Sequence, residues 1–168
     1  MTTQARDEII WRVIDREGGV KDIGDGKGVT RWGQTPGWLD HFNLPIPETD
    51  EQAAENYAAW IAITGLDAVV GDTADPLADF VIDFAVHSGH IPAIKVLQRA
   101  LRIKDDGRVG PATRGAVDRA DRYNLALGVL AAQGQYQGAL ITDDPDEYAR
   151  WARGWSNRQA KKLLQLSR

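Results

Sequence analysis

The sequence predicts a mainly α-helical protein with one small Gly-rich loop or β-hairpin lobe. Apolar residues recur at helical spacing in several separate stretches. Residues 20–37 are instead rich in Gly, Asp and Thr, with few long apolar side chains, which is typical of a loop or short hairpin. No stretch has the pattern of a strong central strand. The length of 168 residues, with 43% hydrophobic and 26% charged residues, fits a single globular domain.

In the first half of the chain, residues typical of helix ends predict where each helix begins or stops. Gly18-Gly19 ends the first helix, because glycine accepts the left-handed conformation there. The inward face of this helix carries Ile10, Val13, Ile14 and Glu17. Thr49-Asp50-Glu51-Gln52 matches a capping box and opens a second helix that stops near Gly65. Asp75-Pro76 is a cap followed by proline, and residues 77–86 are apolar on nearly every side, which predicts a buried central helix.

The second half is predicted to be helical with short turns. Pro92 opens a helix, and Asp106-Gly107 forms the turn after it. Pro111 opens a short helix, and another is expected over residues 122–133. Asp144-Pro145 caps a last helix, whose apolar stripe holds Tyr148, Trp151 and Trp155. We expect the Trp residues of the helical stripes to belong to the core.

The composition excludes several classes of protein. Without Cys there is no disulfide framework, thiolate zinc site or Cys nucleophile. No apolar run approaches the roughly 20 residues of a membrane span, and the polar start of the chain lacks the features of a secretory signal. Residues 1–89 carry 6 basic and 16 acidic residues, and residues 90–168 carry 14 and 8. This division favours an acidic chemical site beside an anion-seeking surface, although two solvated faces without a partner explain it equally well.

Glu17 is a candidate catalytic acid. It lies on the apolar face of its helix, where partial desolvation favours the neutral carboxyl, and near the negative end of the helix dipole. A carboxylic acid held in this way can donate a proton near neutral pH. The alternative is that Glu17 reaches solvent at a frayed helix end and pairs with Arg16 or Arg12.

The loop after Glu17 supplies further candidates. Glycoside hydrolysis usually uses two carboxyl groups, and Asp22 and Asp25 are available for the second role. Thr30 would orient a water molecule, and Trp32 offers a flat face for a sugar ring. Structural explanations stay open beside these, because Asp favours turns, Thr30 suits a hairpin and Trp32 suits a core.

An ordered series of motifs runs from about residue 7 to 160. It comprises Arg16-Glu17-Gly18-Gly19, DGKGVTRWGQT at 25–35, DFAVHSG at 83–89, LQRAL at 97–101 with DGRVGPAT at 106–113, and GWSNR at 154–158. Together these segments resemble glycoside hydrolase family 108, the lysozyme-like N-acetylmuramidases of phage and bacteria. The LQRAL and DGRVGPAT segments resemble the predicted peptidoglycan-associated region that follows the muramidase part of that family.

The resemblance implies a lysozyme-like fold and a function. The expected activity is hydrolysis of the β-1,4 bond between N-acetylmuramic acid and N-acetylglucosamine in peptidoglycan, without a cofactor. The implied catalytic residues are Glu17 as general acid, Asp25 and Thr30. The implied substrate-binding residues are Trp32, Asp22, Asp83 and His87. Residues 1–168 would form one muramidase domain, with a catalytic part at 1–89 and a helical peptidoglycan-associated part at 90–168 packed on it.

The resemblance also implies a setting for the protein. The expected partner is the glycan strand of peptidoglycan, with no nucleic acid and no stable membrane insertion, and the protein is expected to be a monomer. An endolysin of this kind stays in the host cytoplasm until lysis and needs a holin-type protein to reach the periplasm and cell wall. His87 and His90 form a pair, but no Cys or third His lies near, so we expect no metal site.

Departures from the family pattern leave alternatives open. The loop between Glu17 and Thr30 is about one residue short, and Lys27 interrupts the expected Gly pair, so either Asp22 or Asp25 can be the second carboxylate. Gln34 replaces an apolar residue, and His87 stands where Asn is usual. A lytic transglycosylase, or a non-enzymatic peptidoglycan-binding or virion module, remains an alternative function.

Overall fold

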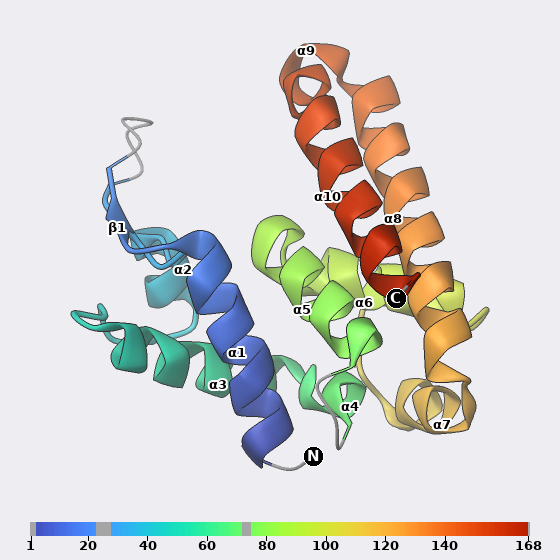
Figure 1. Cartoon of the computed structure of the whole chain (residues 1–168), viewed down its shortest axis with the longest axis horizontal. Coiled ribbons are helices and arrows are strands. Elements are labelled where there is room, and N and C mark those ends of the chain that lie inside the picture. The colour runs from blue at the N-terminus through green and yellow to red at the C-terminus, as the bar shows by residue number, and fades with distance from the viewer. Residues whose placement is uncertain (1–2, 23–27, 72–74, 168) are drawn as a thin grey trace. The chain divides into compact units, whose positions relative to one another are not determined.

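The computed structural model describes residues 3–22, 28–71 and 75–167 of the chain. The chain divides into two compact units, Met1–Ala74 and Asp75–Arg168. The prediction of a mainly helical fold with one small hairpin is confirmed (Figure 1). The division falls before the buried central helix, so this helix belongs to the same unit as the segment at 90–168.

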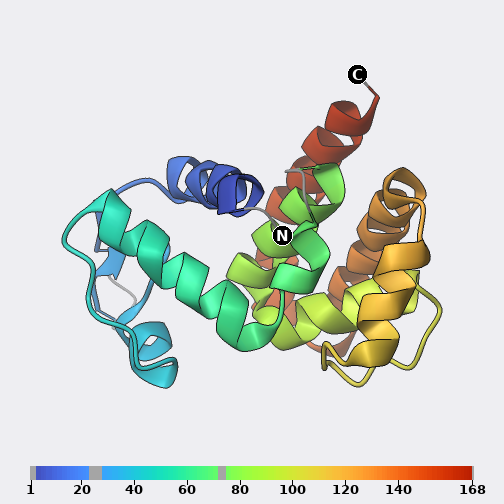
Figure 2. The ribbon, with the colours of Figure 1, turned by 90° about the horizontal axis from the view of Figure 1, so that it is seen from below.

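The first unit is built on two helices that pack together, α1 and α3, both of which contact α4. The helices that the structure describes in this unit are α1 (Thr3–Glu17), α2 (Pro36–His41), α3 (Asp50–Thr64) and α4 (Asp67–Val70). The strands β1 (Val20–Lys21) and β2 (Thr30–Arg31) pair antiparallel, with Val20 opposite Arg31. In Figure 2, α2 and this hairpin lie toward the end of the unit where α3 begins, and Trp38 of α2 contacts Tyr57 and Trp60 of α3 with ring centroids 5.7 Å apart in each case.

The ends of the long helices in this unit agree with the sequence. Thr49 Oγ1 accepts a hydrogen bond from Gln52 N, and Gly65 closes α3 in the left-handed conformation with φ of 76°. The short helices α2 and α4 were not predicted from the sequence. Neither is long enough to show a helical period, since α2 has 6 residues and α4 has 4.

The second unit is a helical assembly around α5. Its helices are α5 (Pro76–Ser88), α6 (His90–Ala100), α7 (Pro111–Arg119), α8 (Arg122–Asp143), α9 (Pro145–Tyr148) and α10 (Ala152–Leu166), with a 3-10 turn at Ala149–Trp151. The helices α5, α6 and α8 pack against one another, and α10 contacts α8 and α5. Figure 1 shows α8 and α10 side by side, with α9 at the turn between them.

The central helix α5 is buried as predicted. Every residue from Leu77 to Ala85 is buried, including two carboxylates, Asp79 and Asp83. Asp75 caps the helix by accepting a hydrogen bond from Ala78 N at 3.0 Å. Because the helix is buried on all sides, its carboxylates require partners within the protein.

Three expectations about the second unit are corrected by the structure. The helix expected to start at Pro92 begins at His90, which places Pro92 in the first turn, where a missing N–H costs nothing. The helix predicted over 122–133 continues to Asp143. The last predicted helix is divided into α9, the 3-10 turn and α10, and Trp151 at the division is 51% exposed rather than part of the core.

The polar network around Gln98 holds the turn after α6. Gln98 is 1% exposed. Its Nε2 donates to Asp106 Oδ1 and to the Arg108 carbonyl oxygen, both at 2.9 Å, and its Oε1 accepts from Gly107 N at 2.9 Å. The Gln of the LQRAL motif is therefore structural, because it satisfies backbone groups of the turn at the buried Gly107. Within the described residues, no helix is both long and apolar enough to cross a membrane.

Candidate functional site

The side chain of Glu17 lies directly against the turn that follows β2. Glu17 is the last residue of α1 and is partly exposed. Gly33 has a φ of 80°, and a Cβ atom there would lie 2.8 Å from Glu17 Cγ and 3.1 Å from Glu17 Oε2. A side chain at position 33 would therefore displace the carboxyl, and the left-handed backbone also favours glycine. A Cβ at Gly19, by contrast, would meet nothing within 4 Å, so the close contact with Glu17 comes from Gly33, further along the chain.

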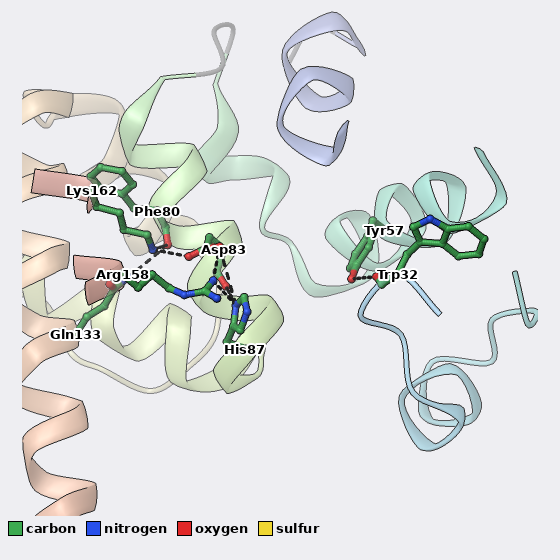
Figure 3. Close-up of polar contacts among 8 residues, drawn as sticks. All are labelled: Trp32, Tyr57, Phe80, Asp83, His87, Gln133, Arg158 and Lys162. Atoms are coloured by element: carbon green, nitrogen blue, oxygen red, sulfur yellow. Dashed lines mark hydrogen bonds and ion pairs between the residues drawn. The ribbon is translucent and has the colours of Figure 1, made fainter. Parts of the chain in front are cut away.

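Tyr57 of α3 completes the surroundings of Gly33. Its hydroxyl oxygen would lie 2.8 Å from the same Cβ position, and it donates a hydrogen bond to the Trp32 carbonyl oxygen at 2.8 Å (Figure 3). Burial, and secondly the negative charge of Glu17, raise the pKa of Tyr57 well above its ordinary value. The hydroxyl therefore stays protonated at neutral pH and acts as a fixed donor beside the carboxyl.

Gln34 and Asn56 hold this turn on α3. Gln34 is 1% exposed, and its Nε2 donates to the Ala53 carbonyl oxygen at 2.8 Å. Its Oε1 accepts a hydrogen bond from Asn56 Nδ2 at 2.9 Å, and the same amide donates to the Pro45 carbonyl oxygen at 2.8 Å. The polar residue that departed from the family pattern is thus the residue that fixes the turn beside Glu17. Nothing in the local sequence around Asn56 or Tyr57 indicated these contacts.

The other predicted residues of the first unit take different positions. Trp32 has a φ of 47° and donates its backbone N–H to the Gly19 carbonyl oxygen at 3.1 Å. Its indole points away from the Tyr57 hydroxyl (Figure 3). Thr30 pairs with Lys21 in the hairpin. Asp22 is exposed just after β1, and Asp25 lies outside the described residues.

Asp83 and His87 belong to a polar cluster in the second unit. Asp83 is 2% exposed, and its Oδ2 lies 2.6 Å from Lys162 Nζ. Its Oδ1 accepts a hydrogen bond from Arg158 Nη1 at 2.9 Å. His87 Nδ1 lies 2.7 Å from the Asp83 carbonyl oxygen and 3.2 Å from Arg158 Nη1 (Figure 3). The DFAVHSG and GWSNR motifs, far apart in the sequence, are therefore joined by an ion pair between α5 and α10.

Lys162 is the buried base of this cluster. It is 6% exposed, and its ammonium group lies 5.4 Å from the centre of the Phe80 ring. Burial lowers the pKa of Lys162, and the neighbouring charge of Asp83 acts in the opposite direction. Both carboxylate oxygens of Asp83 thus have a cationic partner, and this pairing offsets the cost of burying the charges.

A pocket of about 220 Å³ lies beside this cluster. Its walls come from α5, α8, α10 and the turn before α10. The lining includes Asp83, Phe84, His87, Gln133, Gln137, Trp151, Trp155, Arg158, Gln159 and Lys162. Asp83 and His87 were predicted as site residues through the resemblance, whereas Trp151 was predicted to be in the core and is instead an exposed residue of the pocket lining. In the part of the chain that the structure describes, no three His, Cys, Asp or Glu residues are grouped so that they could hold a metal ion.

Comparisons with known proteins connect the second unit to peptidoglycan. Residues 92–160 match the family model described as "Predicted Peptidoglycan domain". The structure is similar to that of Brucella abortus SagA, with a TM-score of 0.75 and 20% sequence identity, covering 98% of this chain and 95% of that chain. This likeness shows a shared fold. No curated protein matches the chain in sequence.

Proposed function

We propose that this chain is a lysozyme-type glycoside hydrolase that cleaves the β-1,4 bond between N-acetylmuramic acid and N-acetylglucosamine in peptidoglycan. The observation that supports the proposal is the position of the Glu17 carboxyl, which lies against Gly33 and Tyr57 at the end of α1. The motif resemblance to glycoside hydrolase family 108 and the peptidoglycan match of residues 92–160 support the choice of substrate.

In the proposed mechanism Glu17 is the general acid. It donates its proton to the glycosidic oxygen as the bond to the sugar breaks. Asp25, or alternatively Asp22, stabilises the positive charge that develops on the sugar or positions the attacking water. Thr30 would orient that water, and the exposed part of Trp32 would stack on a sugar ring. Tyr57 and Gln34 act as positioning residues, because they hold the turn on which the acid rests.

The substitution Glu17→Gln tests the proposal. It preserves the shape of the side chain and removes the transferable proton, so clearing of a peptidoglycan suspension is expected to fall by about 10²-fold or more. The matched control is Glu8→Gln, because Glu8 lies on the same helix and pairs at the surface with Arg12. If Glu17→Gln clears the suspension as fast as the parent protein, Glu17 is not the general acid and the proposal fails; if the parent itself clears nothing, the chain is a binding or virion module.

A lytic transglycosylase is the second candidate. In the described structure, the Glu17 side chain lies against the turn after β2. A transglycosylase needs a single acid of this kind, so this observation also fits that reaction. A transglycosylase forms 1,6-anhydro ends, whereas a hydrolase adds water and forms reducing ends. Mass analysis of the soluble products therefore separates the two reactions, since the anhydro product is lighter by one water.

A further inference from the structure

The lining of the pocket in the second unit is partly polar and partly apolar. Its polar residues include the Asp83 cluster (Asp83, His87, Arg158 and Lys162) together with Gln133, Gln137 and Gln159. Its apolar residues include Phe84, Trp151 and Trp155, and Trp151 is 51% exposed. At about 220 Å³ the pocket is smaller than the roughly 300–1,000 Å³ that encloses a drug-sized ligand, so it suits one end of a larger molecule.

The polar residues of the pocket lining offer hydrogen-bond donors to a ligand. Both oxygens of the Asp83 carboxylate are engaged by Lys162 and Arg158, so this acid is not an acceptor facing the pocket. In the described part of the chain, Arg158 contacts Asp83 and His87 through Nη1, which leaves Nε and Nη2 as donors to a ligand. Gln137 accepts a hydrogen bond from Gln159 with its Oε1, and its own amide nitrogen remains a donor. A ligand that fits must therefore present acceptor oxygens.

The form of Arg158 suits an oxyanion, either a carboxylate or a phosphate, and the carboxylate is the one that the peptides of peptidoglycan carry. A guanidinium presents its donors as a planar fork that matches two oxygens of such a group, and the Arg158 side chain lines the pocket and is 42% exposed. The helix α10 adds Arg153, Lys161 and Lys162 and has no acidic residue. The Trp walls suit the apolar part of the group that carries the carboxylate.

We propose that this pocket binds the carboxylate-bearing end of the peptide attached to peptidoglycan glycan strands, with Arg158 as the group that holds the carboxylate. The choice of peptide rests on the proposed function, because the peptidoglycan assignment identifies which carboxylates the protein meets. The proposal gives the second unit a ligand of its own, distinct from the glycan that Glu17 acts on.

Titration of the full chain with three soluble probes tests this proposal, with Trp fluorescence and calorimetry as readouts. The probes are the free stem tetrapeptide of peptidoglycan, the same peptide with its carboxylates amidated, and glycan oligosaccharides stripped of peptide. Each is added to the parent protein and to the Arg158→Gln and Arg153→Gln variants. Arg153 is the matched control, because it is exposed on the same helix and does not line the pocket.

The expected result is that the free peptide binds to the parent and to Arg153→Gln, and that Arg158→Gln weakens it about tenfold or more. The amidated peptide is expected to bind as weakly to the parent as the free peptide binds to Arg158→Gln. Circular dichroism of Arg158→Gln checks that the fold is retained, and Arg158→Lys, which keeps the charge and loses the fork, is expected to recover only part of the affinity.

The other outcomes overturn the proposal. If no peptide binds, if Arg158→Gln binds it equally well, or if the amidated form binds equally well, the pocket is not a carboxylate site. If the peptide-free glycan displaces the peptide, the pocket is a sugar site instead. Failure of the proposed function is recognised separately: a parent protein that binds the peptide but cleaves no glycan retains the pocket assignment and loses the hydrolase assignment.

Discussion

Gly33 is the residue on which the position of the Glu17 carboxyl depends. Its positive φ and the 2.8 Å approach of Glu17 Cγ and the Tyr57 hydroxyl leave no space for a Cβ atom. Tyr57 cannot yield freely, since its hydroxyl is held by its hydrogen bond to the Trp32 carbonyl oxygen, so the partly exposed Glu17 side chain would have to move. The position of the Glu17 carboxyl therefore depends on Gly33, two residues after β2, having no side chain.

We predict that Gly33→Ala lowers the free energy of unfolding by about 1–3 kcal/mol and reduces peptidoglycan clearing, because it strains the backbone and displaces the acid. Urea denaturation and the clearing assay measure the two effects. Gly37→Ala is the control, since a Cβ at Gly37 meets nothing within 4 Å. A Gly33→Ala protein with the stability and activity of the control would show that Glu17 does not rest on this turn.

At the scale of elements, the ion pair between Asp83 and Lys162 links α5 to α10. Removal of the Lys162 charge takes away the cation beside Asp83 Oδ2, while Arg158 still donates to Oδ1. We predict that Lys162→Met costs about 3 kcal/mol of unfolding free energy, the usual order for breaking a buried pair. Lys161→Met, at the adjacent exposed position, is expected to change stability by less than about 0.5 kcal/mol. Equal midpoints for the two variants in urea would contradict this account of the cluster.

The turn after α6 gives the second unit a stabilising contribution that depends on pH. Hydrogen bonds from the Gln98 side chain, and next from Arg108 N, lower the pKa of Asp106 below its ordinary value. The folded state therefore gains stability from the ionised carboxylate at pH values above about 4, and this gain is lost as the pH falls through the lowered pKa. Asp106→Asn keeps an acceptor oxygen but removes the charge.

We predict that the urea midpoint of the parent falls more between pH 6 and pH 3 than that of Asp106→Asn. Asp118→Asn is the comparison variant, because Asp118 is exposed on α7, and its midpoint should follow the parent. Parallel midpoint curves for the parent and Asp106→Asn would mean that the hydrogen bonds of Asp106 do not favour its charged form.

At the scale of the whole molecule, the two compact units differ in charge and in proposed role. Residues 1–74 carry 6 basic and 13 acidic residues, a balance of −7, and residues 75–168 carry 14 and 11, a balance of +3. The proposed acid lies in the first unit, and the peptidoglycan match lies in the second. We therefore expect cleavage and wall binding to be separable functions.

The prediction is that Glu17→Gln sediments with insoluble peptidoglycan within about twofold of the parent while its cleavage is lost. The fraction of the parent and of Glu17→Gln that sediments with peptidoglycan should decrease as added salt screens the positive charge of the second unit. A cosedimentation assay at low and high ionic strength measures both quantities. If Glu17→Gln no longer sediments, wall binding depends on the first unit, and the assignment of separate roles is wrong.

Much of the helical fold follows from the sequence, because its signals are local. Thr49 and Asp75 each bond a backbone N–H three residues away, and Gly65 closes α3 through its own φ. Such contacts involve neighbouring residues only, so composition and spacing reveal them. Glu17 could also be identified from the sequence as a candidate acid, since helical periodicity placed it on the apolar face of its helix.

The surroundings of both candidate sites were decided by tertiary structure. The contacts that hold the turn beside Glu17 join residues 19, 22 and 25 positions apart, between Gln34, Asn56, Tyr57 and their partners. The pair of Arg158 and Asp83 joins residues 75 positions apart. By itself the sequence determined where most of the longer helices lie and that Glu17 lies at a helix end. Only the packing of α3 against α1, and of α10 against α5, selected the side chains that surround each carboxylate, because a buried charge takes its partners from whichever elements are packed around it.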